Sequence, residues 1–165
     1  MKTLFQLFIL VFLSNLISKA QSDRTLITAE MKENIILYNS KINEVIERNT
    51  LNGFKIIKEE KLPIRSDIDM VVILPLYAGD WYHFSFVGDP SAQKIKATLF
   101  LEGFGDLVQD RIIVRRENEF WTEFSFLCPQ SGNYELTLYQ KSDISRPLSY
   151  LTVFKKEDLI ETRTE

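Results

Sequence analysis

The chain has 165 residues, of which 45% are apolar and 26% are charged, and its formal net charge is −3. This length and composition suit one globular domain with an adequate core. Its basic residues occur in runs of two at most, such as Arg115-Arg116 and Lys155-Lys156. Nucleic acid, which is bound mainly by clustered Lys and Arg, is therefore not an expected partner.

Residues 1–20 have the features of a secretory signal peptide. A positive start precedes a nearly continuous apolar run from residue 4 to residue 17, and small residues at Ser18 and Ala20 fit the cleavage rule. The apolar run is shorter than the roughly 20 residues that a membrane-spanning helix needs. We therefore predict cleavage after Ala20 and an exported protein, in the periplasm or outside the cell, with no stable membrane span.

Residues 28–49 carry apolar side chains at spacings of three and four, the pattern of an amphipathic helix. The stripe consists of Met31, Ile35, Tyr38, Ile42 and Val45. Thr28 is a suitable N-cap, and Asn52-Gly53 supplies a stop signal. The stripe suits packing on the chain's own domain, which we favour, or a helix-mediated dimer. Since its length is short for a stable coiled coil, a monomer is the favoured state.

After Gly53 the apolar period changes to two, which is typical of strands. The expected strands are residues 54–59, 69–77, 81–87, 94–101, 108–115, 119–127, 133–140 and 149–154. Turn residues such as Gly79, Pro90 and Gly132 separate them. This pattern predicts a mainly β, jelly-roll-like antiparallel sandwich of about eight strands, with one N-terminal α-helix packed on it.

The expected organisation has four parts. They are a signal peptide (1–20), an N-terminal helical segment (21–53), a β-sandwich domain (54–155) and a polar C-terminal tail (156–165). The charged stretch 55–69 fits either an edge strand or a linker, and the sequence leaves this choice open.

Alternation along the strands assigns side chains to an inward and an outward face. The inward set is Tyr82, Phe84, Phe86, Ile95, Ala97, Leu99, Leu101, Phe120, Phe124, Phe126, Cys128, Tyr134, Leu136 and Leu138. Lys94, Lys96 and Thr98 are expected to face outward. Cys128 is the only cysteine, so no internal disulfide can form, and its inward position predicts a buried small apolar side chain.

Four aromatic side chains fall on outward positions, namely Trp81, Phe100, Trp121 and Tyr139. So many outward rings suggest a cover or a partner. The candidate ligand-binding residues are therefore Trp81, His83, Trp121 and Tyr139. Two explanations stay open: the helix covers these rings, or they form an exposed platform on which a sugar stacks.

The sequence offers few residues for catalysis or metal binding. His83 is the only histidine and no Gly-x-Ser-x-Gly motif is present, and one histidine and one cysteine are too few for a usual zinc site. Asp80, Asp89, Asp106 and Asp110 lie in or near turns without the spacing of a calcium loop. We expect no cofactor, no metal and no catalytic residue, and a glycosidase carboxylate pair stays an open alternative.

Three stretches between residues 76 and 139 carry a family resemblance. They are "LYAGDWYHFSF" (76–86), "ATLFLEGFGDLV" (97–108) and "FSFLCPQSGNYELTLY" (124–139). The order of a glycine-aspartate turn, an aromatic strand, an aliphatic strand and a Ser-Gly turn resembles bacterial pre-peptidase C-terminal domains and related jelly-roll-like accessory sandwiches. The acidic residues of many members are replaced here by Lys94-Ile95-Lys96. The resemblance implies a non-catalytic accessory module without a metal role. The leader, which ends in Ala20-Gln21-Ser22, resembles export signals of Bacteroidetes-type bacteria.

These observations lead to three functional hypotheses. The first is an exported, non-catalytic sandwich of the bacterial envelope that acts as a binding or structural accessory module, with another envelope protein or a glycan as its partner. The second is a carbohydrate-binding module with an exposed aromatic face. The third is a small glycan-directed hydrolase with an unrecognised carboxylate pair.

Overall fold

The computed structural model describes residues 29–101, 107–114 and 119–157, the strand 107–114 through its backbone alone. The predicted signal peptide, Thr28, Asp106 and residues 158–165 lie outside the described residues, as do the side chains of Leu101 and Asp110. The chain divides into two compact units, Met1–Ile36 and Leu37–Glu165, and the second holds all the described strands.

All eight expected strands are present, with ends that differ from the prediction by two residues at most. They are β1 (Phe54–Lys61), β2 (Met70–Leu76), β3 (Trp81–Val87), β4 (Lys94–Leu101), β5 (Leu107–Val114), β6 (Trp121–Leu127), β7 (Gly132–Lys141) and β8 (Tyr150–Lys156). The charged stretch 55–69, which fitted either an edge strand or a linker, begins within β1, at the edge of a sheet. Its charged side chains suit that position because an edge strand must discourage further pairing.

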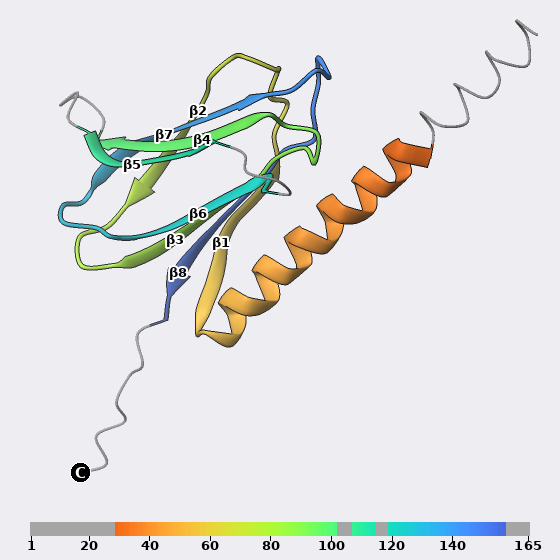
Figure 1. Cartoon of the computed structure of the whole chain (residues 1–165). Coiled ribbons are helices and arrows are strands. Elements are labelled where there is room, and N and C mark those ends of the chain that lie inside the picture. Colours follow the sequence, from red (N-terminus) through yellow and green to blue (C-terminus); the bar gives the residue numbers. More distant parts are fainter. Residues whose placement is uncertain (1–28, 102–106, 115–118, 158–165) are drawn as a thin grey trace, which may run out of the picture. The chain divides into compact units, whose positions relative to one another are not determined.

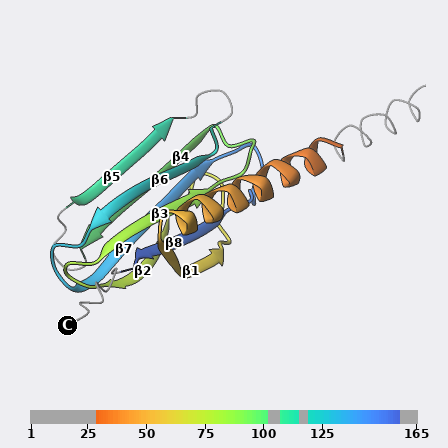
Figure 2. The same ribbon diagram turned by 90° about the horizontal axis from the view of Figure 1, so that it is seen from below.

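The strands form two four-stranded antiparallel sheets, which Figure 1 shows as two layers. Sheet A has the order β1-β8-β3-β6 and sheet B the order β2-β7-β4-β5. The pairs β1·β8, β2·β7, β3·β6 and β4·β5 therefore alternate between the sheets, as in one long hairpin folded over on itself. That is the jelly-roll arrangement, and the predicted fold class is confirmed. Figure 2 shows the strands of both sheets from below.

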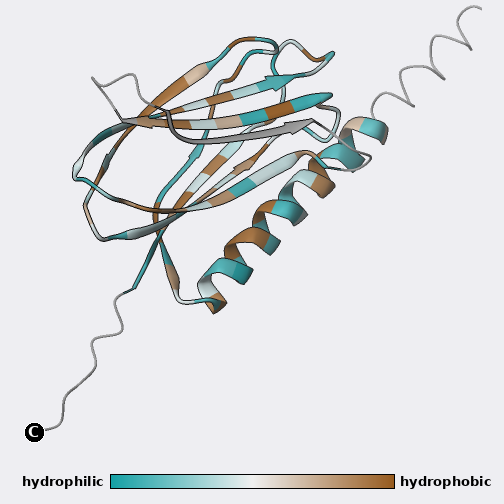
Figure 3. Ribbon diagram, turned by 60° about the vertical axis from the view of Figure 1, so that its left-hand side comes forward, coloured by the Kyte–Doolittle hydropathy of each residue, from teal (hydrophilic) through white to brown (hydrophobic). Residues whose placement is uncertain are grey.

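The core lies between the two sheets, and alternate residues of β2, β3, β4, β6, β7 and β8 build it, as the bands along the ribbon in Figure 3 indicate. Tyr82, Phe84 and Phe86 of β3 are almost wholly buried, and so are Tyr134, Leu136 and Leu138 of β7. The rings of Phe84 and Phe124 stack with centroids 4.9 Å apart. Cys128 is buried in the same cluster, as predicted.

One of the face assignments was wrong. Phe120 precedes β6 and packs with Tyr38, Ile42 and Val87 outside the sandwich core, because the strand pattern begins only at Trp121. Thr98 lies on the outward side of β4, between the inward Ala97 and Leu99, as predicted, but it is buried.

The N-terminal helix spans residues 29–51 and ends at Asn52-Gly53, as the stop signal predicts. Gly53 has a φ of +76°, the left-handed conformation that glycine adopts without strain. Tyr38, Ile42 and Val45 are buried against the strand domain, which confirms packing for this part of the stripe. Met31 and Ile35 are exposed instead. No helix among the described residues is long and apolar enough to cross a membrane.

Candidate functional site

The four candidate ligand-binding residues do not form one site. Trp81 and His83 on β3 and Trp121 on β6 belong to sheet A, whereas Tyr139 on β7 belongs to sheet B. The outward positions of β7 point away from sheet A, so Tyr139 cannot share a ligand surface with the two tryptophans. The sequence could not show this, because alternation gives the face of a strand and not the sheet that the strand joins.

The N-terminal helix covers Trp121. The Nζ atom of Lys41 lies 3.8 Å from the centroid of the Trp121 ring, a close cation–π contact. Phe120 meets the same ring edge-on at 5.7 Å, and the ring packs against the cluster that contains Tyr38 and Ile42. Trp121 is therefore part of the helix–sheet interface and not an open stacking surface.

His83 lies under the same helix and has partners for both ring nitrogens. Its Nδ1 atom is 2.9 Å from Ser125 Oγ, and its Nε2 atom is 3.3 Å from Glu123 Oε2. A carboxylate only accepts hydrogen bonds, so Nε2 carries a proton; in the neutral ring Nδ1 then accepts from the Ser125 hydroxyl. The ring packs beside Phe54 and Phe154, and the His83 side chain is 14% exposed.

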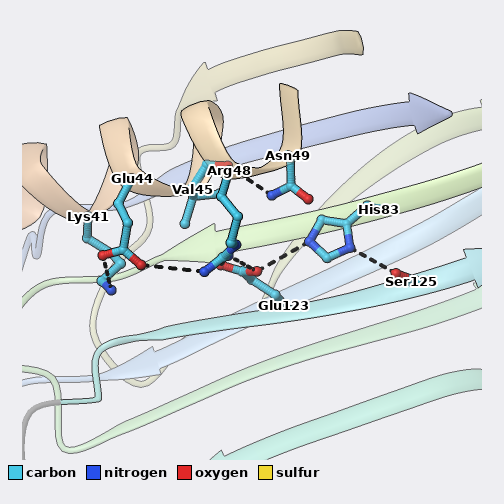
Figure 4. Close-up of polar contacts among 8 residues, drawn as sticks. All are labelled: Lys41, Glu44, Val45, Arg48, Asn49, His83, Glu123 and Ser125. Carbon is cyan, nitrogen blue, oxygen red and sulfur yellow. Dashed lines mark hydrogen bonds and ion pairs between the residues drawn. The ribbon is translucent and has the colours of Figure 1, made fainter. Parts of the chain in front are cut away.

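A chain of charges connects His83 to the helix (Figure 4). Arg48 donates to both oxygens of Glu123, and its Nη1 atom lies 3.4 Å from Glu44 Oε1. Glu44 also pairs with Lys41 at 2.5 Å. Burial raises the pKa of Glu123, but the hydrogen bond with His83 and the charge of Arg48 outweigh it and hold that pKa below its ordinary value.

Ser125, His83 and Glu123 have the order of contacts of a hydrolase triad, hydroxyl to imidazole to carboxylate. Such a triad also needs donors for an oxyanion and a cleft that holds the substrate. A pocket of about 560 Å³ is lined by residues 62–65 and 146–147, none of which belongs to the three. Because Glu123 is bound by Arg48 and the histidine lies beneath the helix, we interpret this network as the attachment of helix to sheet.

Sequence reasoning missed Glu123 and Ser125. Both stand on outward positions of β6, opposite the inward Phe124, so alternation alone would have placed them on the face of Trp121. Their contact with His83 depends on the register of β3 against β6, in which His83 faces Ser125 directly. A register between strands that are not adjacent in sequence cannot be read from one chain.

Trp81 is the candidate ligand-binding residue whose ring remains largely exposed. It is 48% exposed, and its ring meets Phe54 edge-on with centroids 6.0 Å apart. The register pairs Trp81 directly with Leu127 of β6, which is 66% exposed. Directly opposed residues point to the same side of an antiparallel pair. Two large apolar side chains are therefore exposed next to each other on the outward face of sheet A.

One charged group lies near this pair. The Nζ atom of Lys156 is 4.9 Å from the centroid of the Phe54 ring, which in turn meets Trp81. Lys155 binds Asp80 at 2.7 Å in the turn before β3, and that hydrogen bond lowers the pKa of Asp80 below its ordinary value. This ion pair belongs to the side of β3 that carries Tyr82, because Lys155 is paired with Tyr82 and Asp80 accepts from its hydroxyl.

Tyr139 has a local role on sheet B. Its hydroxyl donates to Asp67 Oδ1 at 2.5 Å, and Lys94 lies 5.7 Å from its ring centroid. The hydrogen bond to the Asp67 carboxylate, with burial, raises the pKa of Tyr139. This contact fastens the loop before β2 to β7.

Of the four acidic residues considered for calcium, the two whose side chains the structure describes have structural partners. Asp80 accepts from Tyr82 and Lys155, and Asp89 accepts from the backbone of Ser91 and Leu148. Among the described residues, no three side chains of His, Cys, Asp or Glu are grouped so that they could hold a metal ion.

Comparison with known proteins assigns the chain to no family. No family model and no curated protein matches the sequence. Among solved structures, the chain is similar to PliG from Aeromonas hydrophila, a periplasmic inhibitor of g-type lysozyme, with 14% identity over 60% of this chain and 85% of that one and a TM-score of 0.44. It is also similar to the CBM22-1–GH10 modules of the Clostridium thermocellum xylanase 10B, with 14% identity over 64% of this chain and 26% of that one and a TM-score of 0.31.

Proposed function

We propose that this chain is an exported, non-catalytic accessory module that binds a partner protein of the bacterial envelope through Trp81 and Leu127. We call these two residues, together with Phe54 and Lys156 beside Trp81, the Trp81 surface. The observation that carries the proposal is the direct pairing of a half-exposed tryptophan with an even more exposed leucine on one sheet face.

The Trp81 surface has the composition of a protein-binding site. Tryptophan is enriched among the residues that dominate binding energy, and such residues lie within a polar border. Phe54 packs edge-on against the Trp81 ring, which restricts the ring on that side. The resemblance to pre-peptidase C-terminal domains, which are accessory modules, supports the same class of function.

A carbohydrate platform is the less favoured function of the same residue. The predicted platform required several rings on one open face, but Trp121 is covered by the helix and Tyr139 lies in the other sheet. Trp81 alone could still stack on one sugar ring. The experiment below therefore distinguishes a protein from a glycan.

The proposal is tested with the protein without residues 1–20, immobilised and exposed to an envelope extract of the source organism. Bound proteins are quantified by mass spectrometry for the wild type, Trp81→Ala, Leu127→Ala and the control Ile73→Ala. Ile73 is a half-exposed residue on the outward face of β2, in the other sheet. We expect a protein that is retained by the wild type and the control and lost from both other variants.

A glycan panel read by tryptophan fluorescence completes the test. A glycan response that disappears in Trp81→Ala, with no Trp81-dependent protein in the extract, would replace the protein partner with a sugar. Equal retention of every protein by the wild type and Trp81→Ala would reject the Trp81 surface as a protein-binding site.

A further inference from the structure

A second candidate site lies away from the Trp81 surface, in the loops that join β1 to β2 and β7 to β8. Leu62, Pro63, Ile64 and Arg65 of the first loop and Arg146 and Pro147 of the second line a pocket of about 560 Å³. This volume is within the range of sites that hold small ligands. None of these residues was singled out by the sequence.

Hydrogen bonds between the two loops build the pocket. Ser149 Oγ donates to the carbonyl oxygen of Leu62 at 2.6 Å, and the Leu62 amide donates back to the carbonyl of Ser149 at 3.1 Å. Ser66 Oγ similarly donates to the carbonyl of Ser142 at 2.5 Å and accepts from its amide at 2.9 Å. The two loops are thus joined on both sides of Arg65 and Arg146.

Buried polar groups fix the second loop from behind. The Asp89 carboxylate accepts from the amide of Leu148 at 2.9 Å, and the Gln140 side chain donates to the carbonyl of Leu148 at 3.1 Å. Gln140 is fully buried, and Pro147 is buried beside Leu148. Because this loop is held before any ligand arrives, a ligand would meet a preformed pocket.

The two arginines are the charged residues that line the pocket. Both are exposed, and within the described part of the chain neither side chain has an ion pair or a hydrogen bond to another residue. The same loops also carry Asp67, Asp69 and Asp143, none of which lines the pocket; Asp67 accepts from Tyr139 and Asp143 accepts from Gln93. The apolar lining residues are Leu62, Pro63, Ile64 and Pro147, of which Pro63 is exposed, while Leu62 and Ile64 are largely buried in the sandwich core.

We infer that this pocket binds an oxyanion group, a carboxylate or a phosphate monoester, that is attached to a short apolar body. The planar guanidinium groups of Arg65 and Arg146 match the geometry of such an oxyanion and can each donate two hydrogen bonds to it. The apolar body packs against Leu62, Ile64 and the two prolines. The inference does not depend on the function proposed for the Trp81 surface.

The test measures binding of three probes of equal chain length, hexanoate, hexyl phosphate and hexanol, by NMR titration of the ¹⁵N-labelled protein without residues 1–20. We expect both anions to shift the amide signals of Leu62, Ile64, Arg65 and Arg146, while hexanol at the same concentration does not. The Trp81 indole signal should stay in place, which separates this pocket from the Trp81 surface. The tighter of the two anions identifies the preferred oxyanion.

Substitutions of the two arginines test whether their charges bind the anion. Arg65→Gln and Arg146→Gln should each weaken binding about tenfold, as expected when a charge-assisted hydrogen bond is lost. The control Lys55→Gln removes an exposed cation at the far end of β1 and should leave binding unchanged. Both arginines are exposed, so the variants keep the fold, which an unchanged urea midpoint verifies. Equal binding of hexanol and hexanoate, or full affinity in the double variant, would overturn the inference.

Discussion

The guanidinium group of Arg48, on the N-terminal helix, donates to both carboxylate oxygens of Glu123, on β6. The Glu123 side chain is only 15% exposed, so this ion pair is partly removed from water. Arg48 and Glu123 are 75 residues apart in sequence, and their contact joins the helix to sheet A at the point where His83 lies.

Arg48→Met tests how much this contact contributes to stability. The substitution keeps an apolar stem but leaves Glu123 without its strongest positive neighbour, and we expect a loss of about 1–3 kcal/mol, between the values for exposed and buried pairs. The measurement is urea unfolding followed by tryptophan fluorescence. Lys55→Met is the control, because it removes a fully surface-located pair with Glu157 and should cost less than about 0.5 kcal/mol. Equal losses of stability in the two variants would mean that the Arg48–Glu123 contact contributes no more than an exposed ion pair.

Acid should weaken the same contact. The pKa of Glu123 in the folded protein lies below its ordinary value of 4.5, so the folded state binds this proton less readily than the unfolded chain does. The stabilisation is therefore complete above about pH 5 and is lost as the pH falls through the lowered pKa. We expect the stability difference between the wild type and Glu123→Gln to be largest near pH 6 and to shrink by about pH 3. Asp80 also has a lowered pKa, but it is present in both proteins, so its contribution cancels. Parallel pH curves for the two proteins would contradict this prediction.

The sequence predicted most of the fold because the fold depends on local patterns. Alternation located the eight strands, and the change of period at Gly53 separated helix from sandwich. The candidate site depends on contacts between distant segments. Both main contacts depend on the position of the helix on sheet A. They are the contact of Lys41 with the Trp121 ring and that of Arg48 with Glu123. The two loops that bring Arg65 and Arg146 to one pocket are about 80 residues apart, and nothing in the pattern of either loop indicates the other.

The coverage of Trp121 gives a test of helix packing. Ile42 is buried in the cluster that includes Phe120 and Trp121. Ile42→Ala should cost about 2–4 kcal/mol, because it leaves a cavity between helix and sheet, and it should shift tryptophan emission toward that of a more hydrated indole. Leu51→Ala, at a helix position that is 80% exposed, should change neither quantity. An unchanged emission spectrum in Ile42→Ala, with the protein folded, would mean that the helix does not shield Trp121.

Two buried hydroxyl groups provide the last prediction. Within the described part of the chain, Ser85 Oγ and Thr122 Oγ1 are buried and have no hydrogen-bond partner. An unpartnered buried hydroxyl loses its bonds to water on folding and gains none in return. We therefore expect Ser85→Ala and Thr122→Val to leave stability unchanged or to raise it by up to about 1 kcal/mol. Ser149→Ala is the matched control, since the buried Ser149 hydroxyl donates to Leu62 at 2.6 Å. Its loss leaves a carbonyl oxygen without a donor and should cost about 1–2 kcal/mol in the same urea measurement. A loss of that size in Ser85→Ala or Thr122→Val would show that the hydroxyl has a partner, such as a buried water molecule, and the comparison with Ser149→Ala would then measure the strength of that bond.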